Sequence, residues 1–352
     1  MAPRFPFSTL PVGWYRIADS KDLKPGQVKS VRCFGKDLVV FRARSGGVTL
    51  LDAFCPHMGA HLGLGSVQGD NLRCVFHGWL FDREGVCTAL PGDRRIPPRA
   101  HTRAWPTSER NGQIMAFYHP LGEAPSWQVP TLPEAIDPAW TGLRRGPRWR
   151  MRTHPQDMLE NGMDLAHFPV LHHKQTRAAE SLDLTTDGPF LVHRTFQHYQ
   201  IFKLAKLLGG EVAGPLDLHL YGLGLAVNRA VVDARVQLSY TLAFFLTPVE
   251  EDVVDVIAYF AVRKVYSRAA TFLLLRKAML EARRTIGEDR PVWETKAYLA
   301  RPALAEGDGR IMPYRRWAQQ FYVRADCPDD LISTAAALTD APAIAREGLP
   351  TS

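Results

Sequence analysis

Two short pairs of cysteine and histidine constrain this chain more than any other feature. The first is Cys55-Pro56-His57 and the second is Cys74-Val75-Phe76-His77, with sixteen residues between His57 and Cys74. Each pair offers one thiolate and one imidazole, whereas a structural zinc site more usually pairs like with like, as C-x2-C and H-x3-5-H. Glycines that would let the backbone approach a bound group follow both pairs: Gly59, Gly63, Gly65 and Gly78. The fold must therefore bring two loops face to face around a metal group.

This mixed pattern resembles that of the Rieske family. In a Rieske [2Fe-2S] centre two cysteines hold one iron and two histidines hold the other, so we expect these cluster ligands: Cys55, His57, Cys74 and His77. Respiratory members of the family carry a further cysteine in each cluster loop, and these two form a disulfide. Here Ala60 and Phe76 occupy those places, so the sequence resembles the oxygenase branch. His61 lies outside the pattern, and we expect it at the surface or beside a ligand.

A second metal motif, D-x2-H-x4-H, is formed by Asp164, His167 and His172. The segment from Asp157 to Phe168 is predicted as a helix, on which Asp164 and His167 share a face. Pro169 is expected to disrupt that helix, so that the chain turns and His172 points back to the same metal. Two imidazoles and one carboxylate form the facial triad of non-haem Fe(II) oxygenases. The neighbouring His173 is an alternative to His172, but the spacing favours His172.

The carboxylate of such a triad should come from far along the chain, on a second helix that closes the site. The segment from Ile286 to Lys296, IGEDRPVWETK, resembles the stretch in which Rieske oxygenases place their ligand aspartate, and Asp289 is the matching residue. Glu288 and Glu294 remain alternatives. A solvated acidic helix start is the non-functional interpretation.

The distribution of strand and helix signals predicts an α+β protein. Residues 8–120 read as an all-β domain of short strands, 121–325 as a catalytic domain and 326–352 as a tail without an assigned role. In the catalytic domain we expect strands over 230–245 and 252–262 and a helix with a basic face over 271–286. The apolar stretches 218–227 and 242–246 are interpreted as strand core, with the lining of an apolar pocket as the alternative.

Composition excludes several classes of protein. Five cysteines among 352 residues form no disulfide framework, and the absence of an apolar leader or span predicts a soluble, cytoplasmic protein. The net charge of +7 comes without a nucleic-acid motif, so nucleic-acid binding is not expected. One dense basic cluster, from Arg144 to Arg152, is predicted as a strand with a solvated basic face; the alternative is a docking surface for an acidic electron donor.

From about Pro11 to Tyr322 the chain is similar to Rieske oxygenase α-subunits that lack a β-subunit. The stretches CPHMGAHLGLG, FHGWLFDREG, ENGMDLAHFPVLH and EDRPVWETK most resemble the sterol 7-desaturase and 3-ketosteroid 9α-hydroxylase group. The resemblance implies a Rieske β-domain followed by a helix-grip catalytic domain with an antiparallel sheet, in a homotrimer. It also implies a mononuclear Fe(II) that activates O2 for a monooxygenase, either a hydroxylase or a desaturase, acting on a hydrophobic substrate with steroids as candidates.

The chain carries no Rossmann fingerprint, so a separate NAD(P)H-dependent reductase or a ferredoxin should deliver electrons. In the family it resembles, the aspartate at position 164 hydrogen-bonds a ligand histidine of its own iron and a cluster histidine of the neighbouring subunit, which implies His167 and His77. Local hydrogen bonding by Asp164 is the alternative. Two other functions stay open: demethylation or hydroxylation of an aromatic or amine compound, and electron transfer by a Rieske carrier fused to a lipid-binding domain.

Overall fold

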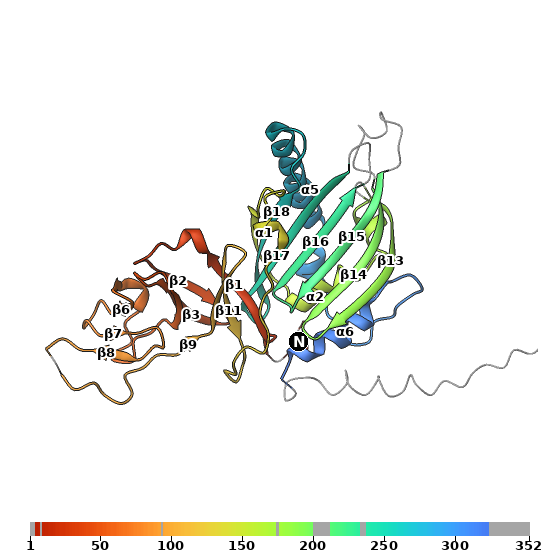
Figure 1. Cartoon of the computed structure of the whole chain (residues 1–352). Coiled ribbons are helices and arrows are strands. Elements are labelled where there is room, and N and C mark those ends of the chain that lie inside the picture. Colours follow the sequence, from red (N-terminus) through yellow and green to blue (C-terminus); the bar gives the residue numbers. More distant parts are fainter. Residues whose placement is uncertain are drawn as a thin grey trace, which may run out of the picture.

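The computed structural model describes residues 4–7, 9–92, 94–173, 176–199, 212–232 and 237–323. It shows a smaller N-terminal part made of strands and a larger part in which a broad sheet carries helices (Figure 1). The predicted fold class, an all-β domain followed by an α+β domain with an antiparallel sheet, is confirmed. The predicted tail, 326–352, lies outside the described residues. The expected boundary near residue 120 stays a prediction.

Three small antiparallel sheets build the N-terminal part, in the orders β2-β3-β4-β9, β5-β6-β7-β8 and β1-β11-β10. Their strands are β1 (Gly13–Asp19), β2 (Val28–Cys33), β3 (Lys36–Arg42), β4 (Val48–Asp52), β5 (Ser66–Gln68), β6 (Asn71–Arg73), β7 (Leu80–Phe81), β8 (Cys87–Ala89), β9 (Ala104–Trp105), β10 (Thr107–Arg110) and β11 (Gln113–Tyr118). Two 3-10 helices, η1 (Ser20–Asp22) and η2 (Leu62–Leu64), lie between them.

Strand β3 shows how the sequence makes this domain. Successive side chains of a strand point to opposite faces of its sheet. Val39 and Phe41 accordingly pack in one core, which also contains Cys55 and Cys74, while Val40 packs in a second core on the other face. The first core is therefore the support on which both cysteine loops rest.

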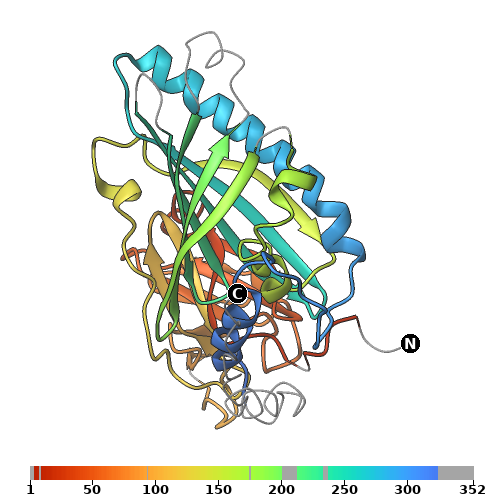
Figure 2. The same ribbon diagram turned by 90° about the vertical axis from the view of Figure 1, so that its right-hand side faces the viewer.

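The larger part is built on a seven-stranded antiparallel sheet in the order β12-β18-β17-β16-β15-β14-β13. Its strands are β12 (Arg144–Met151), β13 (Thr176–Asp187), β14 (Phe190–Tyr199), β15 (Val212–Tyr221), β16 (Leu225–Val232), β17 (Leu238–Glu250) and β18 (Val253–Val262). The long helix α5 (Arg268–Thr295) crosses one face of the sheet (Figure 2). The shorter helices are α1 (Pro133–Ile136), α2 (Pro155–Glu160), α3 (Phe168–Leu171), α6 (Ile311–Ala318) and the 3-10 helix η3 (Gln319–Phe321).

The N-terminal part is joined to the sheet by strands β1 and β17. Thr247 donates its hydroxyl proton to the Arg16 carbonyl at 2.7 Å, and the Phe34 amide donates to the Pro248 carbonyl at 2.9 Å. Trp14 and residues of β17 and β18 share a further hydrophobic core. This junction holds the sheet β5-β6-β7-β8 at the end of the molecule away from α2 and α5 (Figure 1).

Two predicted elements are wrong in detail. The expected helix over 157–168 is broken: α2 ends at Glu160, and α3 begins only at Phe168. Pro169 lies in the first turn of α3, where proline is tolerated, so it helps to start a helix instead of ending one. The expected strand over 230–245 is divided between β16 and β17.

The other two predicted elements of the catalytic domain are confirmed. Strand β18 matches the strand expected over 252–262, and α5 contains the helix expected over 271–286. Helix α5 continues well beyond Ile286, so the predicted ligand segment belongs to the same helix.

The basic cluster lies on β12, as predicted, but aspartates pair with several of its arginines. Arg145 lies 3.0 Å from Asp19, and Arg148 lies 2.5 Å from Asp255. Arg152 also lies 2.8 Å from Asp252. This strand is therefore less positive than its sequence suggests. Among the described helices, none has the length and apolar character needed to cross a membrane.

Candidate metal centres

The two Cys/His loops have the same backbone closure. In each loop the cysteine N–H donates to the carbonyl five residues later, at 2.9 Å for Cys55 and 2.8 Å for Cys74. The cysteine carbonyl in turn accepts from the glycine four residues later, Gly59 at 2.9 Å and Gly78 at 3.1 Å. Both glycines have φ above +70°, a conformation that favours glycine over other residues. The sequence thus folds twice into one tight loop, and each loop offers a thiol and an imidazole.

The side chains of these loops are arranged by depth. Cys55 and Cys74 are buried, whereas His57 and His77 are exposed, with ring centroids 4.5 Å apart. The ring of His57 stacks on Trp79 at 4.4 Å. Burial, together with the neighbouring Cys74, raises the pKa of the Cys55 thiol to about 11. Thiolates in this place need a positive partner, which a metal cluster provides.

The arrangement fits a two-iron cluster better than a single zinc ion. Among the described residues, the one group whose possible ligand atoms all lie within 4.8 Å of one another is elsewhere in the chain. A tetrahedral zinc ion would draw four Cys and His ligand atoms roughly that close together. Two buried thiols beside two exposed imidazoles are instead the set of two cysteine and two histidine ligands that a Rieske [2Fe-2S] group uses. His61 is not part of it, since its Nδ1 accepts the Gly63 amide proton at 3.0 Å and caps η2.

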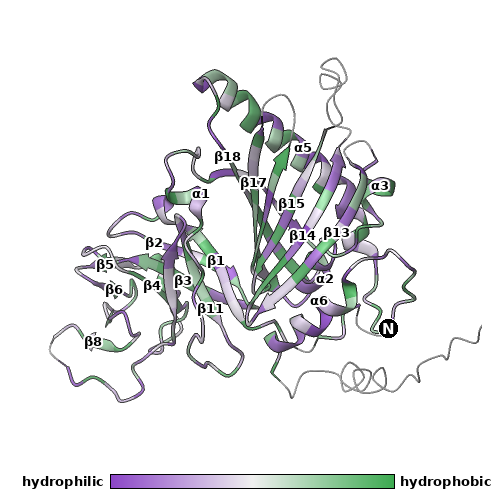
Figure 3. Ribbon diagram, turned by 45° about the vertical axis from the view of Figure 1, so that its right-hand side comes forward, coloured by the Kyte–Doolittle hydropathy of each residue, from purple (hydrophilic) through white to green (hydrophobic). Residues whose placement is uncertain are grey.

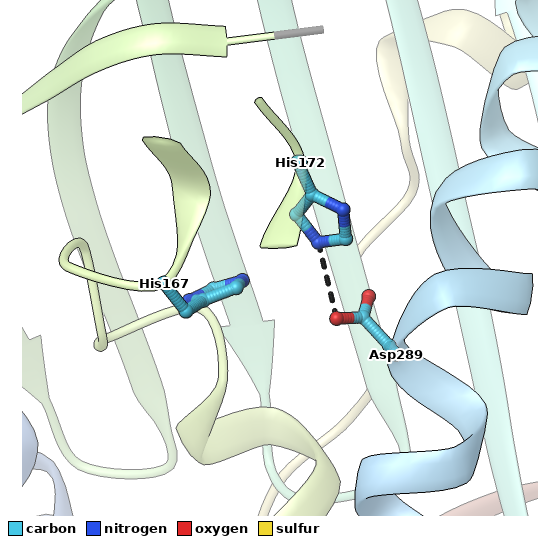
Figure 4. A group of neighbouring side chains, drawn as sticks. All are labelled: His167, His172 and Asp289. Atoms are coloured by element: carbon cyan, nitrogen blue, oxygen red, sulfur yellow. Dashed lines mark ion pairs between the residues drawn. The ribbon is translucent and has the colours of Figure 1, made fainter. Parts of the chain in front are cut away.

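That other group consists of His167, His172 and Asp289 (Figure 4). His167 caps the start of α3 and His172 caps its end, so one short helix sets both imidazoles. Their ring centroids are 5.2 Å apart. Asp289 reaches them from α5, and its Oδ1 lies 3.0 Å from His172 Nε2. Two imidazoles and one buried carboxylate converging on one point are a donor set that suits Fe(II).

The alternatives to these residues point elsewhere. Glu288 lies 2.9 Å from Nδ1 of His172, which is the side of the ring away from Asp289. Glu294 pairs with Arg290 at 3.1 Å. His173 is exposed, and its Nδ1 lies 3.2 Å from the carbonyl of Val170. The non-functional interpretation, in which these acidic residues form a solvated helix start, does not fit Asp289, which lies inside α5 and is 4% exposed.

Asn161 is a site residue that the sequence reasoning missed. Its Nδ2 lies 3.2 Å from Nε2 of His167 and donates to Oδ1 of Asp289, also at 3.2 Å. The turn that follows it is held by His193, whose Nδ1 lies 3.1 Å from the Gly162 carbonyl. A polar residue directly before Gly162, within a stretch otherwise read as helix, was the available signal.

Burial and charge act differently on the two histidines. Burial lowers the pKa of His167, which favours the neutral imidazole that a metal requires. Burial also disfavours protonation of His172, but hydrogen bonds and charges from Asp289 and Glu288 outweigh it and raise the pKa of His172. The two histidines of the triad therefore lie in different electrostatic environments.

Asp164 makes local contacts within the chain. Its Oδ1 accepts from the Ala166 amide at 3.0 Å and from the His167 amide at 3.3 Å. Its Oδ2 lies 3.7 Å from Nδ1 of His167, and the side chain is 32% exposed. The local role is thus visible, and it includes the backbone carbonyl of Asp164, which lies 2.6 Å from His167 Nδ1.

A cavity of about 280 Å³ opens beside the triad, between α5 and the sheet. Most of its wall is apolar and includes Leu218, Leu242 and Phe244, so the predicted strand-core residues also line a pocket. Gln197 is an exception: it is 3% exposed, and its Nε2 has no hydrogen-bond partner among the described residues. The site can therefore hold a largely apolar molecule next to a metal.

Comparison with known proteins agrees with both centres. Residues 13–104 match the Rieske [2Fe-2S] domain, and residues 116–322 match the 3-ketosteroid 9α-hydroxylase C-terminal domain. The cholesterol 7-desaturase nvd 1 of Ciona intestinalis is 34% identical over 338 residues, which cover 89% of this chain and 68% of that protein. The oxygenase component of a 3-ketosteroid-9-alpha-monooxygenase of Rhodococcus rhodochrous is 30% identical over 88% of this chain and 81% of its own length.

Solved structures show the same fold at lower identity. Dicamba monooxygenase bound to 3,6-dichlorosalicylic acid superposes with a TM-score of 0.70 at 20% identity, over 92% of this chain and 98% of that one. Pseudomonas putida CBB5 NdmA with caffeine gives a TM-score of 0.69 at 20% identity, over 87% and 89%.

Proposed function

The chain belongs to the Rieske non-haem iron oxygenases, in the group of the 3-ketosteroid 9α-hydroxylases and cholesterol 7-desaturases, and we propose that it is the oxygenase component of a steroid-directed monooxygenase. One observation carries the proposal: the triad of His167, His172 and Asp289 lies in the wall of an apolar cavity. Relatives at about this identity are named for cholesterol or 3-ketosteroids. The neighbours named for dicamba and caffeine support the fold alone, because only 20% of their residues are identical.

We assign the cluster to the two loops and the mononuclear iron to the triad. Cys55 and Cys74 would hold the inner iron of the cluster, and His57 and His77 the outer one, because the thiols are buried and the imidazoles are exposed. When bound, the mononuclear iron would supply O2 activation beside the substrate, with electrons from the cluster. A pure electron carrier would have no use for the triad.

The residues around the triad orient the ligands. Glu288 accepts the Nδ1 proton of His172, so that Nε2, which lies 3.0 Å from Asp289, is the nitrogen that would bind the metal. The Asn161 amide lies against both His167 and Asp289 and limits rotation of these two side chains. The apolar wall of the cavity excludes water and leaves few polar contacts to a substrate, among them Gln197.

The electron route is proposed to cross between subunits of a homotrimer. Within one chain the sheet β5-β6-β7-β8 lies at the end of the molecule away from α5, the helix that carries Asp289 (Figure 1). Exposed apolar side chains surround the cluster histidines, as expected of a docking surface: Phe54, Met58, Val75 and Phe76. The partly exposed Asp164 beside His167 would receive His77 of a neighbouring chain. A separate reductase or ferredoxin would supply the cluster with electrons, as expected for an oxygenase component.

Metal analysis and product analysis test the proposal together. The reconstituted enzyme should hold three irons per chain, and Asp289→Ala should hold two, with an unchanged cluster spectrum and no turnover. Full activity of that variant would move the ligand role to Glu288 or Glu294.

Products are then identified by mass spectrometry from a panel of steroids, aromatic acids and amines, with a surrogate reductase. Oxidation of an aromatic or amine compound alone would overturn the steroid assignment.

A further inference from the structure

The outer face of α5 exposes large apolar side chains. Phe272 is 57% exposed, Leu273 is 67% exposed and Leu280 is 62% exposed, and Tyr266, just before the helix, is 91% exposed. These four residues are called the apolar strip below. The first turns of α5 project beyond the end of the sheet, with hydrophobic and hydrophilic residues mixed along them (Figure 3). The strip is therefore a protruding surface, not a groove.

The strip is surrounded by positive charge. From position 263 to 284 the sequence holds one acidic residue, Glu281, and seven basic residues: Arg263, Lys264, Arg268, Arg276, Lys277, Arg283 and Arg284. Among the described residues, Arg276 and Arg283 are exposed and take part in no ion pair. The arginines of β12 differ, since aspartates neutralise several of them. The charges of Arg276 and Arg283 therefore remain available to an external partner.

The opposite face of the same helix segment forms a wall of the substrate cavity. Leu274, Ala278 and Ala282 line the cavity, one helical turn apart, while Leu273 and Leu280 point outward. One helix therefore separates the substrate cavity from any surface that contacts the strip.

We propose that the apolar strip and its arginines dock the enzyme onto an anionic lipid surface. A helix with exposed Phe and Leu beside Lys and Arg is the pattern that places apolar side chains below lipid headgroups and cations among them. The purpose of this docking rests on the proposed function: an apolar substrate concentrates in lipid, and the strip places the cavity wall against it. The docking itself is independent of what the cavity binds.

A protein partner matches the strip less well. A stable protein interface covers about 800 Å² on each partner and has an apolar core with few charges. The strip consists of three side chains on one helix and a fourth, Tyr266, just before it, and arginines lie between them. A second copy of the chain that met the strip with its own strip is a weaker match for another reason, because like charges would face each other.

Flotation of the full-length holoenzyme with vesicles tests the proposal without any substrate. Binding to vesicles of phosphatidylcholine with about a third phosphatidylglycerol is compared with binding to pure phosphatidylcholine, at low and high salt. Leu273→Ser with Leu280→Ser removes the apolar contact, and Arg276→Gln with Arg283→Gln removes charge. The matched control is Ile136→Ser with Leu182→Ser, which changes two residues of similar exposure on other elements, 71% and 58%.

The enzyme should float with anionic vesicles and lose affinity as salt rises. The arginine pair should weaken binding about 25-fold, since each cation contributes roughly fivefold. The leucine pair should weaken it at least as much, and the control pair should not change it. Absence of flotation, or equal binding by all variants, would overturn the proposal. If only the leucine pair changed the oligomeric state, as measured by light scattering, the strip would be a contact with a second copy of the chain and not with lipid.

Discussion

Glu288 and Asp289, consecutive residues of α5, contact opposite nitrogens of the same imidazole: Glu288 Oε2 lies 2.9 Å from His172 Nδ1, and Asp289 Oδ1 lies 3.0 Å from its Nε2. The Arg284 guanidinium, 3.2 Å from Glu288, fixes the outer carboxylate in turn. A carboxylate on the far nitrogen of a metal-bound histidine sets its tautomer and increases its basicity. Glu288 is therefore positioned to orient His172, and Asp289 is positioned to bind the metal beside it.

Glu288→Ala should weaken iron binding at the triad by 10- to 100-fold while the cluster stays intact. The physical reason is that His172 loses the acceptor that holds its ring. The affinity is measured by competition with an iron chelator, and the cluster is followed by its visible spectrum. Glu294→Ala is the matched control, because Glu294 pairs only with the exposed Arg290 among the described residues. Equal affinities of the two variants would refute the orienting role.

His57→Cys or Cys74→Ser should abolish the normal Rieske spectrum and leave the catalytic domain folded. The two cluster loops rest on the core of a separate β-domain, so their loss is local. Visible and EPR spectra report the cluster, and circular dichroism reports the fold. Unchanged spectra in either variant would remove the basis for the cluster ligands.

Asp164→Asn should keep both metals but slow electron transfer from the cluster to the mononuclear iron steeply. The amide retains the local contacts with the Ala166 and His167 amides but loses the charge that lies 3.7 Å from His167 Nδ1 and that would hold the proton of a neighbouring subunit's histidine. The measurement is single-turnover oxidation of the pre-reduced cluster with substrate and O2. A wild-type rate would leave Asp164 with the local role alone. A fully active monomer of the wild-type enzyme would contradict the route between subunits.

Gln197→Leu should raise the KM for a substrate that carries a carbonyl or hydroxyl oxygen about tenfold, because one buried hydrogen bond contributes about 1 kcal/mol or somewhat more. A substrate analogue without that oxygen should bind the variant as well as it binds the wild type. The Gln197 amide has no other acceptor among the described residues, so the protein's stability should not fall. Binding is followed by titration of the holoenzyme with both compounds. If both compounds lost the same affinity for the variant, Gln197 would act only through packing.

His154→Asn should make stability less dependent on pH in the acid range. Burial lowers the pKa of His154 to about 3, whereas in the unfolded chain it is about 6.5. Below pH 6.5 the unfolded state therefore binds the extra proton, and the native state loses up to about 1.4 kcal/mol per pH unit down to pH 3. Asparagine keeps the cap on the Gln156 amide, which His154 Nδ1 accepts at 3.2 Å. The melting temperatures of the wild type and of His154→Asn, measured from pH 7.5 to 5, check this prediction. If both proteins showed the same dependence of melting temperature on pH, the prediction would be wrong.

The sequence by itself determined those features whose partners are close along the chain. Each cluster loop contains its own thiol, imidazole and glycine, so the pattern C-x-H with C-x2-H predicts the whole centre. The pair His167 and His172 is likewise set by one short helix. The short runs of β-branched and aromatic residues in β3 and β18 predict strands because strand propensity is a local property of the sequence.

Only the tertiary structure decided the features that depend on distant packing. Glu288 and Asp289 are neighbours of the same chemical type, and no local rule separates them; their different roles arise because α5 presents them to opposite sides of His172. The break after Glu160 also escaped the sequence, since the turn at Gly162 is held by His193 from a strand far along the chain. Residues such as Asn161 and Gln197 became recognisable only when the fold placed one between two ligands and the other in an apolar wall. Contacts between residues far apart in sequence are a property of the packed molecule, and they decided which polar groups serve the site.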